Sequence, residues 1–308
     1  MIRPFKRVAG QVFATPVARF AAGAALLSAL AFVALPASAA EDAAKGGGTE
    51  VHEHDTPVPP REPWSFAGAF GKYDPGQLQR GFRVFREVCA NCHSAEKLAF
   101  RNLAEPGGPG FSEGQVKALA AEYKVKDGPN DAGEMFERPA RASDKWPSPF
   151  PNANAARAAN GGGLPPDMSV LAKARDVHNP FPKFVFNALP FLSYQEGGPD
   201  YIAALLTGYK DPPADVKLEG GQYFNEFMPG GKIAMPPPLS GDGQVEYTDG
   251  TPATVKQYAK DVSAYLMWMA EPKLDQRKRT GFRVVIFLIV LSILLYATKR
   301  RVWSNVAH

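Results

Sequence analysis

The segment Cys89-Ala90-Asn91-Cys92-His93 is the strongest chemical signal in the sequence. Two thiols three positions apart can each add to one vinyl group of a haem, and the histidine that follows can then ligate the iron. The spacing is specific because the porphyrin fixes the distance between its two vinyl groups. The chain has no other cysteines. The segment therefore predicts one covalently attached haem c, bound through Cys89 and Cys92, with His93 as an iron ligand.

Two other interpretations of a C-x-x-C pair are weaker in this sequence. A thioredoxin-type redox pair belongs to a βαβ pattern, which is absent here, and does not need the histidine. A zinc site needs two further ligands at suitable spacing. With two cysteines in 308 residues, a four-cysteine iron–sulfur or zinc site and a disulfide framework are both excluded.

The second axial position of the iron decides between electron transfer and ligand chemistry. An open position would permit a peroxidase or gas-sensing role, whereas a methionine thioether closes the iron and raises its potential. The candidates in the body of the chain are Met135, Met168, Met228, Met235, Met267 and Met269. Met235 precedes three prolines, which restrict the backbone and reduce the entropy lost on ordering the loop. Met235 is therefore the preferred ligand, with Met228 as its rival.

Buried haem propionates would need hydrogen-bond donors. Arg157 and Arg175 are candidates in the central part of the chain. A solvated surface arginine is the alternative for each of them.

A helix that begins after Asp74 leads to the cysteines. Asp74 followed by Pro75 is a helix start, and we expect Gln77 to complete a box-like cap. Apolar residues then recur at helical spacing as far as Cys92. Gly81 costs about 1 kcal/mol relative to alanine inside a helix, so we expect another helix to cross close to it; a tolerated defect is the alternative.

The other firm helix of the body is expected to start at Thr251-Pro252 and to end at Pro272. We expect its apolar face to pack across the first helix near Gly81. Shorter helices are expected within 113–124, 169–176 and 198–208, and loops at 147–168 and 227–241. Pro and Gly make up 58 of the 308 residues, about 19%, compared with the usual ~12%. This composition predicts long ordered loops and a minor sheet at most.

The two ends of the chain predict export and membrane anchoring. Residues 1–40 combine a basic start, an apolar run and small residues, the pattern of a signal peptide; an uncleaved anchor is the alternative. Residues 280–298 would span about 28 Å as a helix, close to the ~30 Å core of a bilayer. A buried core helix is the alternative. Basic clusters flank the span on both sides, so the signal peptide orients it, with residues 299–308 cytoplasmic.

Charge is distributed unevenly along the chain. The net charge is +4, but residues 41–276 hold 24 basic and 31 acidic residues. A nucleic-acid-binding face is therefore unexpected. An acidic body suits a basic protein partner, or alternatively keeps an exported domain soluble.

A set of short motifs follows one order along nearly the whole exported body and the anchor. The motifs are Arg80-Gly81-Phe82-Arg83-Val84-Phe85 before the haem segment, Arg157-Ala158-Ala159-Asn160, Pro165-Pro166-Asp167, Leu206-Thr207-Gly208-Tyr209, Gln222-Tyr223-Phe224-Asn225, Ala234-Met235-Pro236-Pro237-Pro238, Asp249-Gly250-Thr251-Pro252-Ala253-Thr254, Trp268, Glu271-Pro272 and Arg277-Lys278-Arg279. In this order they resemble the cytochrome c1 family, the haem subunit of cytochrome bc1 complexes.

The resemblance implies a mainly α, cytochrome-c-like haem domain with long Pro/Gly-rich loops and one C-terminal transmembrane helix. It makes Met235 the axial partner of His93. It also implies that Asn160 and Pro166 contact the haem ring and that Arg175 and Tyr201 lie at the propionates. Arg175 is therefore preferred to Arg157 as a propionate contact.

The resemblance further implies a one-electron carrier that accepts electrons from a Rieske iron–sulfur protein and passes them to a soluble or membrane-bound cytochrome c. Quinol oxidation would belong to partner subunits, so the chain is not expected to be an enzyme on its own. Cytochrome b, membrane lipid and a dimeric complex are the other expected partners. The alternatives are a membrane-anchored monohaem cytochrome c of another respiratory complex, and a haem enzyme or gas sensor with an exchangeable sixth position.

The expected organisation is a signal peptide (1–40), an extended arm (41–73), a periplasmic haem domain (74–276), an anchor (280–298) and a cytoplasmic tail (299–308), in a bacterial inner membrane. The sequence departs from the family pattern at two places. Met168 follows Pro-Pro-Asp where leucine is usual, a mild change. Segment 178–193 resembles an insertion relative to mitochondrial members and is expected to form a packed Phe/Pro-rich loop.

Overall fold

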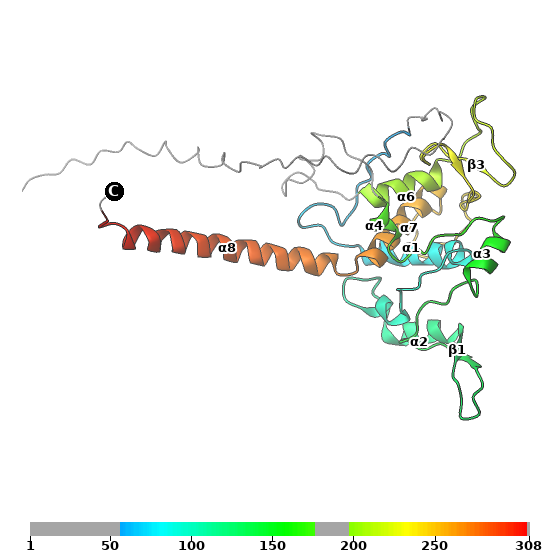
Figure 1. Cartoon of the computed structure of the whole chain (residues 1–308), viewed down its shortest axis with the longest axis horizontal. Coiled ribbons are helices and arrows are strands. Elements are labelled where there is room, and N and C mark those ends of the chain that lie inside the picture. Colours follow the sequence, from blue (N-terminus) through cyan, green and yellow to red (C-terminus); the bar gives the residue numbers. More distant parts are fainter. Residues whose placement is uncertain (1–55, 176–196, 307–308) are drawn as a thin grey trace, which may run out of the picture. The chain divides into compact units, whose positions relative to one another are not determined.

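The structure is a computed structural model that describes residues 56–175 and 197–306 (Figure 1). Within these ranges helices dominate, and strands form only two small antiparallel pairs, which confirms the expected fold class. The predicted signal peptide, the first part of the predicted arm and the segment 178–193 lie outside the described residues.

The elements follow one another with long loops between them. The helices are α1 (Pro75–Glu87), α2 (Glu113–Ala121), α3 (Ala153–Ala159), α4 (Leu171–Ala174), α6 (Gly197–Thr207), α7 (Val255–Ala270) and α8 (Leu274–Val302), with 3-10 turns η1 (Cys89–Asn91) and η2 (Phe100–Ala104). The strand pairs are β1 (Lys124–Asp127) with β2 (Phe136–Pro139), and β3 (Tyr223–Phe224) with β4 (Lys232–Ile233).

The first helix starts where the sequence predicts, but its cap differs. Asp74 accepts a hydrogen bond from the Gly76 N–H, and Pro75 occupies the first helical position. The predicted role of Gln77 in the cap is wrong. Its side-chain amide instead donates to Asp261 Oδ1 on α7, 3.1 Å away, because Gln77 is buried on the face that α7 covers.

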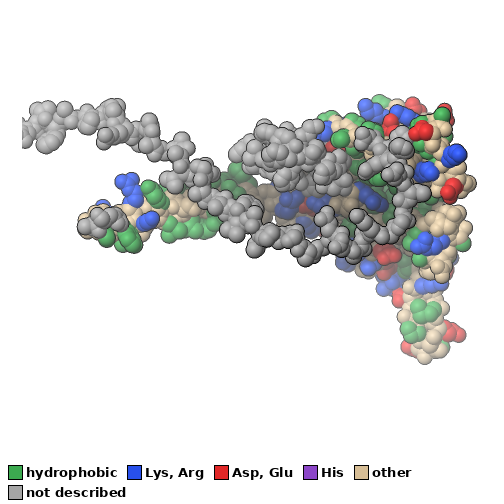
Figure 2. All heavy atoms as spheres, turned by 45° about the horizontal axis from the view of Figure 1, so that its top comes forward, with side chains coloured by type: hydrophobic (Ala, Val, Ile, Leu, Met, Phe, Trp, Pro, Cys, Tyr) green, Lys and Arg blue, Asp and Glu red, His purple; other side chains and the backbone are tan. Residues whose placement is uncertain are grey.

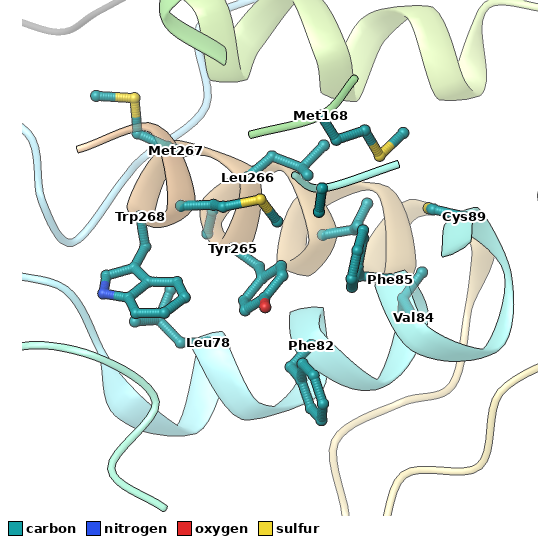
Figure 3. Close-up of a cluster of buried hydrophobic side chains, with 14 of the residues drawn as sticks. Leu78, Phe82, Val84, Phe85, Cys89, Met168, Tyr265, Leu266, Met267 and Trp268 are labelled. Carbon is teal, nitrogen blue, oxygen red and sulfur yellow. The ribbon is translucent and has the colours of Figure 1, made fainter. Parts of the chain in front are cut away.

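Helices α1 and α7 cross in direct contact, and Figure 3 shows their aromatic side chains packed at the crossing. The rings of Phe85 and Tyr265 lie 5.5 Å apart between centroids, and both side chains are fully buried. At Gly81 a Cβ atom would fall 2.1 Å from the carbonyl oxygen of Asp261. The expected crossing at Gly81 is therefore confirmed, and the glycine is required because only a backbone without a side chain leaves room for α7.

A buried carboxylate fixes the register of this crossing. Asp261 is completely buried and accepts hydrogen bonds from Arg80 Nε at 2.8 Å and from the side-chain amides of Gln77 and Gln257. A buried charge is costly unless it is paired and hydrogen-bonded. Sliding α1 along α7 would separate these groups, so the network selects one alignment of the two helices.

Other boundaries differ from the sequence prediction for local reasons. Helix α7 begins at Val255 rather than at Thr251, because Thr254 accepts the hydrogen bond of the Gln257 N–H and is the N-cap. Helix α3 lies inside the predicted loop 147–168. Asn152 caps it, and its alanine-rich sequence has a high helix propensity.

Helix α8 has the length and composition of a membrane span. It is a continuous helix of 29 residues with a mean hydropathy of 2.3 over its most apolar 18 residues, and among the described residues no other helix meets the same requirements. Figure 2 shows apolar side chains along its surface and basic side chains near its C-terminal end. The predicted span 280–298 lies within α8. The helix extends further in both directions, with Lys299, Arg300 and Arg301 in its last turn. Positive charges at this end interact favourably with the helix dipole.

The crossing yields a stability prediction. Gly81→Ala would place a methyl group against the α7 backbone, and we expect a loss of about 1–3 kcal/mol or more from overpacking. Gly114→Ala on α2, where the nearest atom lies 3.9 Å from a new Cβ, is the matched control and should be neutral or stabilise by up to ~1 kcal/mol. Chemical denaturation of the two haem-containing variants measures both effects, and equal stabilities would contradict the prediction.

Candidate functional site

The cysteines lie on a tight turn at the end of α1. The helix ends at Glu87, before the cysteines rather than through them, and the chain tightens into η1. In this turn the N–H groups of Cys92 and His93 both donate to the carbonyl of Cys89, at 3.1 and 3.0 Å. Cys89 is buried and Cys92 exposed, and neither forms a disulfide. Burial, with a smaller contribution from Cys92, raises the pKa of Cys89 to about 12.

His93 is held in the orientation and protonation state of a metal ligand. Its side chain is buried, and Nδ1 lies 2.8 Å from the carbonyl oxygen of Pro166. A carbonyl only accepts, so Nδ1 carries the proton and Nε2 keeps its lone pair. Burial lowers the pKa of His93, and this outweighs the opposing influences of the Pro166 carbonyl and Asp167. The histidine is thus a neutral imidazole with Nε2 available to a metal.

Asp167 joins the segment after the histidine to the loop that contains Pro166. Its Oδ2 accepts hydrogen bonds from Ser94 Oγ and from the Glu96 N–H, both at 2.8 Å, while Oδ1 accepts the Ser169 N–H at 2.9 Å. Burial alone would raise the pKa of Asp167, but these donors lower it below its usual value. The carboxylate therefore stays ionised and keeps the Pro166 carbonyl beside His93.

The loop that carries Met235 lies further along the chain and contacts the same region. The hydroxyl of Tyr209 donates to the Met235 carbonyl at 3.0 Å. A Cβ at Gly163 would lie 3.6 Å from the Cβ of Ala234. The loop before Pro166 is therefore in contact with the loop of Met235. Two segments about 70 residues apart in the sequence, each bearing a residue expected at the haem, are brought together.

The two residues expected at the propionates are also neighbours. Burial raises the pKa of Tyr201, and the nearby positive charge of Arg175 acts in the opposite direction. Arg175 is exposed and ends α4, whereas Tyr201 is half-buried on α6. The Tyr201 hydroxyl also lies 3.8 Å from the sulfur of Met228. The rival methionine is thus next to the expected propionate contacts.

The remaining candidates form the turn after α3. Asn160 is the C-cap residue of this helix and donates from its side-chain amide to the Ala156 carbonyl at 2.7 Å. Arg157 is exposed and donates to the carbonyl of Gly162 at 3.4 Å. Both side chains close the turn that leads to Gly163 and Pro166.

These residues fit a covalently attached haem c. Two unbridged thiols three residues apart precede a buried histidine whose Nε2 is available, which is the donor set that this cofactor requires. The sequence signalled the thiols and the histidine directly. It did not reveal the roles of Asp167 and Tyr209, because these depend on which loops meet.

A mainly helical domain with this site and one apolar C-terminal helix defines a membrane-anchored cytochrome of the c type. The model of the Cytochrome C1 family matches residues 64–306, and the chain belongs to this family. The predicted resemblance is thereby confirmed, and with it covalently attached haem c as the cofactor.

Curated relatives give the same result. Cytochrome c1 of Blastochloris viridis is 46% identical over 290 residues, which cover 94% of this chain and 96% of the relative. Cytochrome c1 of Rhodospirillum rubrum is 44% identical, over 86% of this chain and 92% of the relative. A protein named cytochrome b/c1 from Bradyrhizobium diazoefficiens is 57% identical over 80% of this chain, but the match spans only 36% of that longer protein.

The Asp167 contacts yield a second prediction. Asp167→Ala removes an acceptor from three donors, and we expect a loss of about 2–3 kcal/mol of stability, with partial recovery in Asp167→Asn. Asp131→Ala, at an exposed position in the turn between β1 and β2, is the control and should stay within ±0.5 kcal/mol. Denaturant titration of haem-containing protein measures the loss. Identical midpoints for the Asp167→Ala and Asp131→Ala variants would show that Asp167 does not hold the two segments together.

Proposed function

We propose that this chain is the one-electron carrier of a quinol–cytochrome c oxidoreductase. It accepts an electron from a Rieske iron–sulfur protein and passes it to a soluble or membrane-bound cytochrome c. The observation that carries the proposal is the buried, neutral His93, held through Nδ1 by the Pro166 carbonyl, in a chain of the cytochrome c1 family. The chain performs no bond chemistry itself in this proposal, because quinol oxidation belongs to its partners.

Haem c supplies reversible one-electron redox chemistry when bound. In our proposal His93 and Met235 would be the protein ligands of the haem iron. The other proposed contacts are Asn160 and Pro166 at the ring and Arg175 and Tyr201 at the propionates. A site closed by two protein ligands favours electron transfer over binding of small ligands.

The surrounding contacts keep the proposed ligands in place in both oxidation states. Asp167 and Pro166 hold His93 from one loop. Three prolines restrict the backbone after Met235, and Tyr209 holds the carbonyl of Met235. Ligands that are already positioned need little rearrangement when the charge of the iron changes, and such preorganisation favours fast electron transfer.

We propose that the haem domain is exported and that α8 anchors it in a bacterial inner membrane. The pattern of residues 1–40 supports a cleaved signal peptide. Residues 41–73 would form an arm, 74–276 the periplasmic haem domain, 280–298 the span and 299–308 the cytoplasmic tail. The acidic balance of residues 41–276 supports docking of a basic cytochrome c, since opposite charge raises encounter rates.

The proposed assembly contains cytochrome b and a Rieske protein, in a dimeric complex surrounded by lipid. The relative named cytochrome b/c1, of which this chain matches about a third, supports an association with cytochrome b.

Purification in detergent tests the assembly. We expect cytochrome b and a Rieske protein to co-purify in stoichiometric amounts, and quinol to reduce the bound haem c. Isolation without these subunits, from membranes that retain quinol–cytochrome c activity, would instead favour a tethered carrier of another respiratory complex.

The axial ligand gives a third prediction. Met235→Leu should keep the haem attached but open the iron, so that the reduced protein binds carbon monoxide and the potential falls by on the order of 0.1 V, within the ~0.8 V range that axial ligands control. Met228→Leu is the matched control and should leave both properties unchanged. A redox titration and a carbon monoxide difference spectrum make the comparison. The reverse pattern would assign the ligand to Met228.

Tyr209 gives a fourth prediction. Tyr209→Phe removes a hydrogen bond worth about 0.5–1.5 kcal/mol, so imidazole should displace the sixth ligand of the ferric protein about 2- to 10-fold more readily. Tyr296→Phe, at an exposed position on α8, is the control. Imidazole titration followed in the visible spectrum measures the change. Equal affinities in the two variants would mean that Tyr209 does not position Met235.

A further inference from the structure

We propose that residues 66–71, here called the apolar loop, place Phe70 in the bilayer interface beside α8, where its ring contacts the upper part of the lipid acyl chains. The apolar loop has the sequence Phe-Ala-Gly-Ala-Phe-Gly and contains no charged or hydrogen-bonding side chain. It precedes the haem domain and is separated from α8 by about 200 residues of sequence, so only the fold brings the two together.

The apolar loop presents an exposed phenylalanine next to the start of the anchor. Phe70 is 69% exposed, and its ring lies 5.3 Å from the ring of Phe282 on α8, which is itself 50% exposed. Each phenylalanine therefore covers part of the other and leaves the rest of its surface uncovered. Exposed apolar surface marks protein–protein or membrane interaction sites, and here its contact with the candidate membrane span α8 favours the membrane.

The backbone of the apolar loop is closed and anchored in the core. The Lys72 N–H donates to the Ser65 carbonyl at 3.0 Å, across the base of the loop. At Gly71 a Cβ would lie 2.0 Å from the Ala67 carbonyl oxygen, so only glycine permits this tight path. Phe66 is buried and stacks on Trp64 with 5.3 Å between ring centroids. Phe70 therefore lies on a loop whose conformation is fixed by its own backbone contacts and by the core.

One hydrogen bond ties the apolar loop to the first turns of α8, and a second does so two residues after the loop. Lys278 Nζ donates to the carbonyl of Phe66 at 2.5 Å, and the Tyr73 N–H donates to Asp275 Oδ1 at 3.3 Å. The apolar loop and the start of the anchor are thus held together. The depth of Phe282 in the membrane therefore sets the depth of Phe70.

The length of α8 places Phe282 at a membrane boundary. Phe282 is the third residue of the proposed span 280–298, which is about 28 Å long as a helix at ~1.5 Å per residue, close to the ~30 Å hydrocarbon core. Trp303 is exposed at the other end of the helix, where aromatic residues anchor spans at the interface. Arg279 and Arg283 flank Phe282 and can extend toward lipid headgroups. Phe70 would thus lie at the level of the upper acyl chains, beside these basic groups.

A fluorescent label tests this depth directly. Both native cysteines are used by haem attachment, so an introduced cysteine supplies the reactive thiol. Phe70→Cys is labelled with bimane in the full-length, haem-containing chain, in nanodiscs of phosphatidylcholine and phosphatidylglycerol. Val290→Cys in the middle of α8 is the membrane reference. Phe136→Cys, an exposed phenylalanine on β2, is the aqueous reference. Lipids with a nitroxide at the top or at the end of the acyl chain act as quenchers.

We expect the nitroxide at the top of the chain to remove most of the emission at position 70, and the nitroxide at the end of the chain to quench position 290 more strongly. Position 136 should be unaffected by both. Equal behaviour of positions 70 and 136 would overturn the proposal. The reference at 290 reports separately on whether α8 spans, and its failure would remove the basis of the proposal. Quenching at 70 that disappears in the complex isolated with its partner subunits would assign the apolar loop to a protein contact instead of lipid.

Discussion

The close crossing of α1 and α7 at Gly81 is the constraint on which the rest of the structure depends. Helix α1 ends at the turn that carries the cysteines and His93, and α7 ends a few residues before the anchor helix. The backbone contact at Gly81 and the buried charge of Asp261 allow one alignment of these helices. A well-packed crossing with a paired buried charge resists sliding, because any shift would create voids and would also leave the carboxylate without its hydrogen-bond donors.

The site is assembled from loops, and polar contacts to the backbone hold those loops together. The Pro166 carbonyl sets the tautomer of His93, Asp167 joins that loop to the segment after the histidine, and Tyr209 holds the loop of Met235. Short helices and Pro/Gly-rich segments bury little apolar surface of their own. Hydrogen bonds between segments therefore position the site, while the helix crossing beneath it supplies the rigid support.

Local sequence signals were sufficient to predict those elements whose capping and apolar residues are close neighbours along the chain. The start of α1 at Asp74-Pro75, the short helices α2 and α6, and the apolar stretch within α8 were all predictable, since caps and apolar runs act within one or two turns. Predictions failed for two kinds of reason. Gln77 turns away from its own helix end to the distant Asp261, whereas at the start of α7 a nearer local cap, Thr254, replaces the predicted Thr251. The alanine-rich α3 was missed because the prolines and glycines around it dominate the segment.

The sequence by itself determined the cofactor chemistry, the mainly helical class and the apolar stretch of the anchor. Each of these depends on residues that are neighbours along the chain, and the haem motif in particular lies within five consecutive positions. Only the tertiary structure decided which carbonyl orients His93, which hydroxyl holds the loop of Met235, and that Phe70 lies against Phe282. These pairs are separated by 26 to more than 200 residues, so they exist only once packing has brought the segments together.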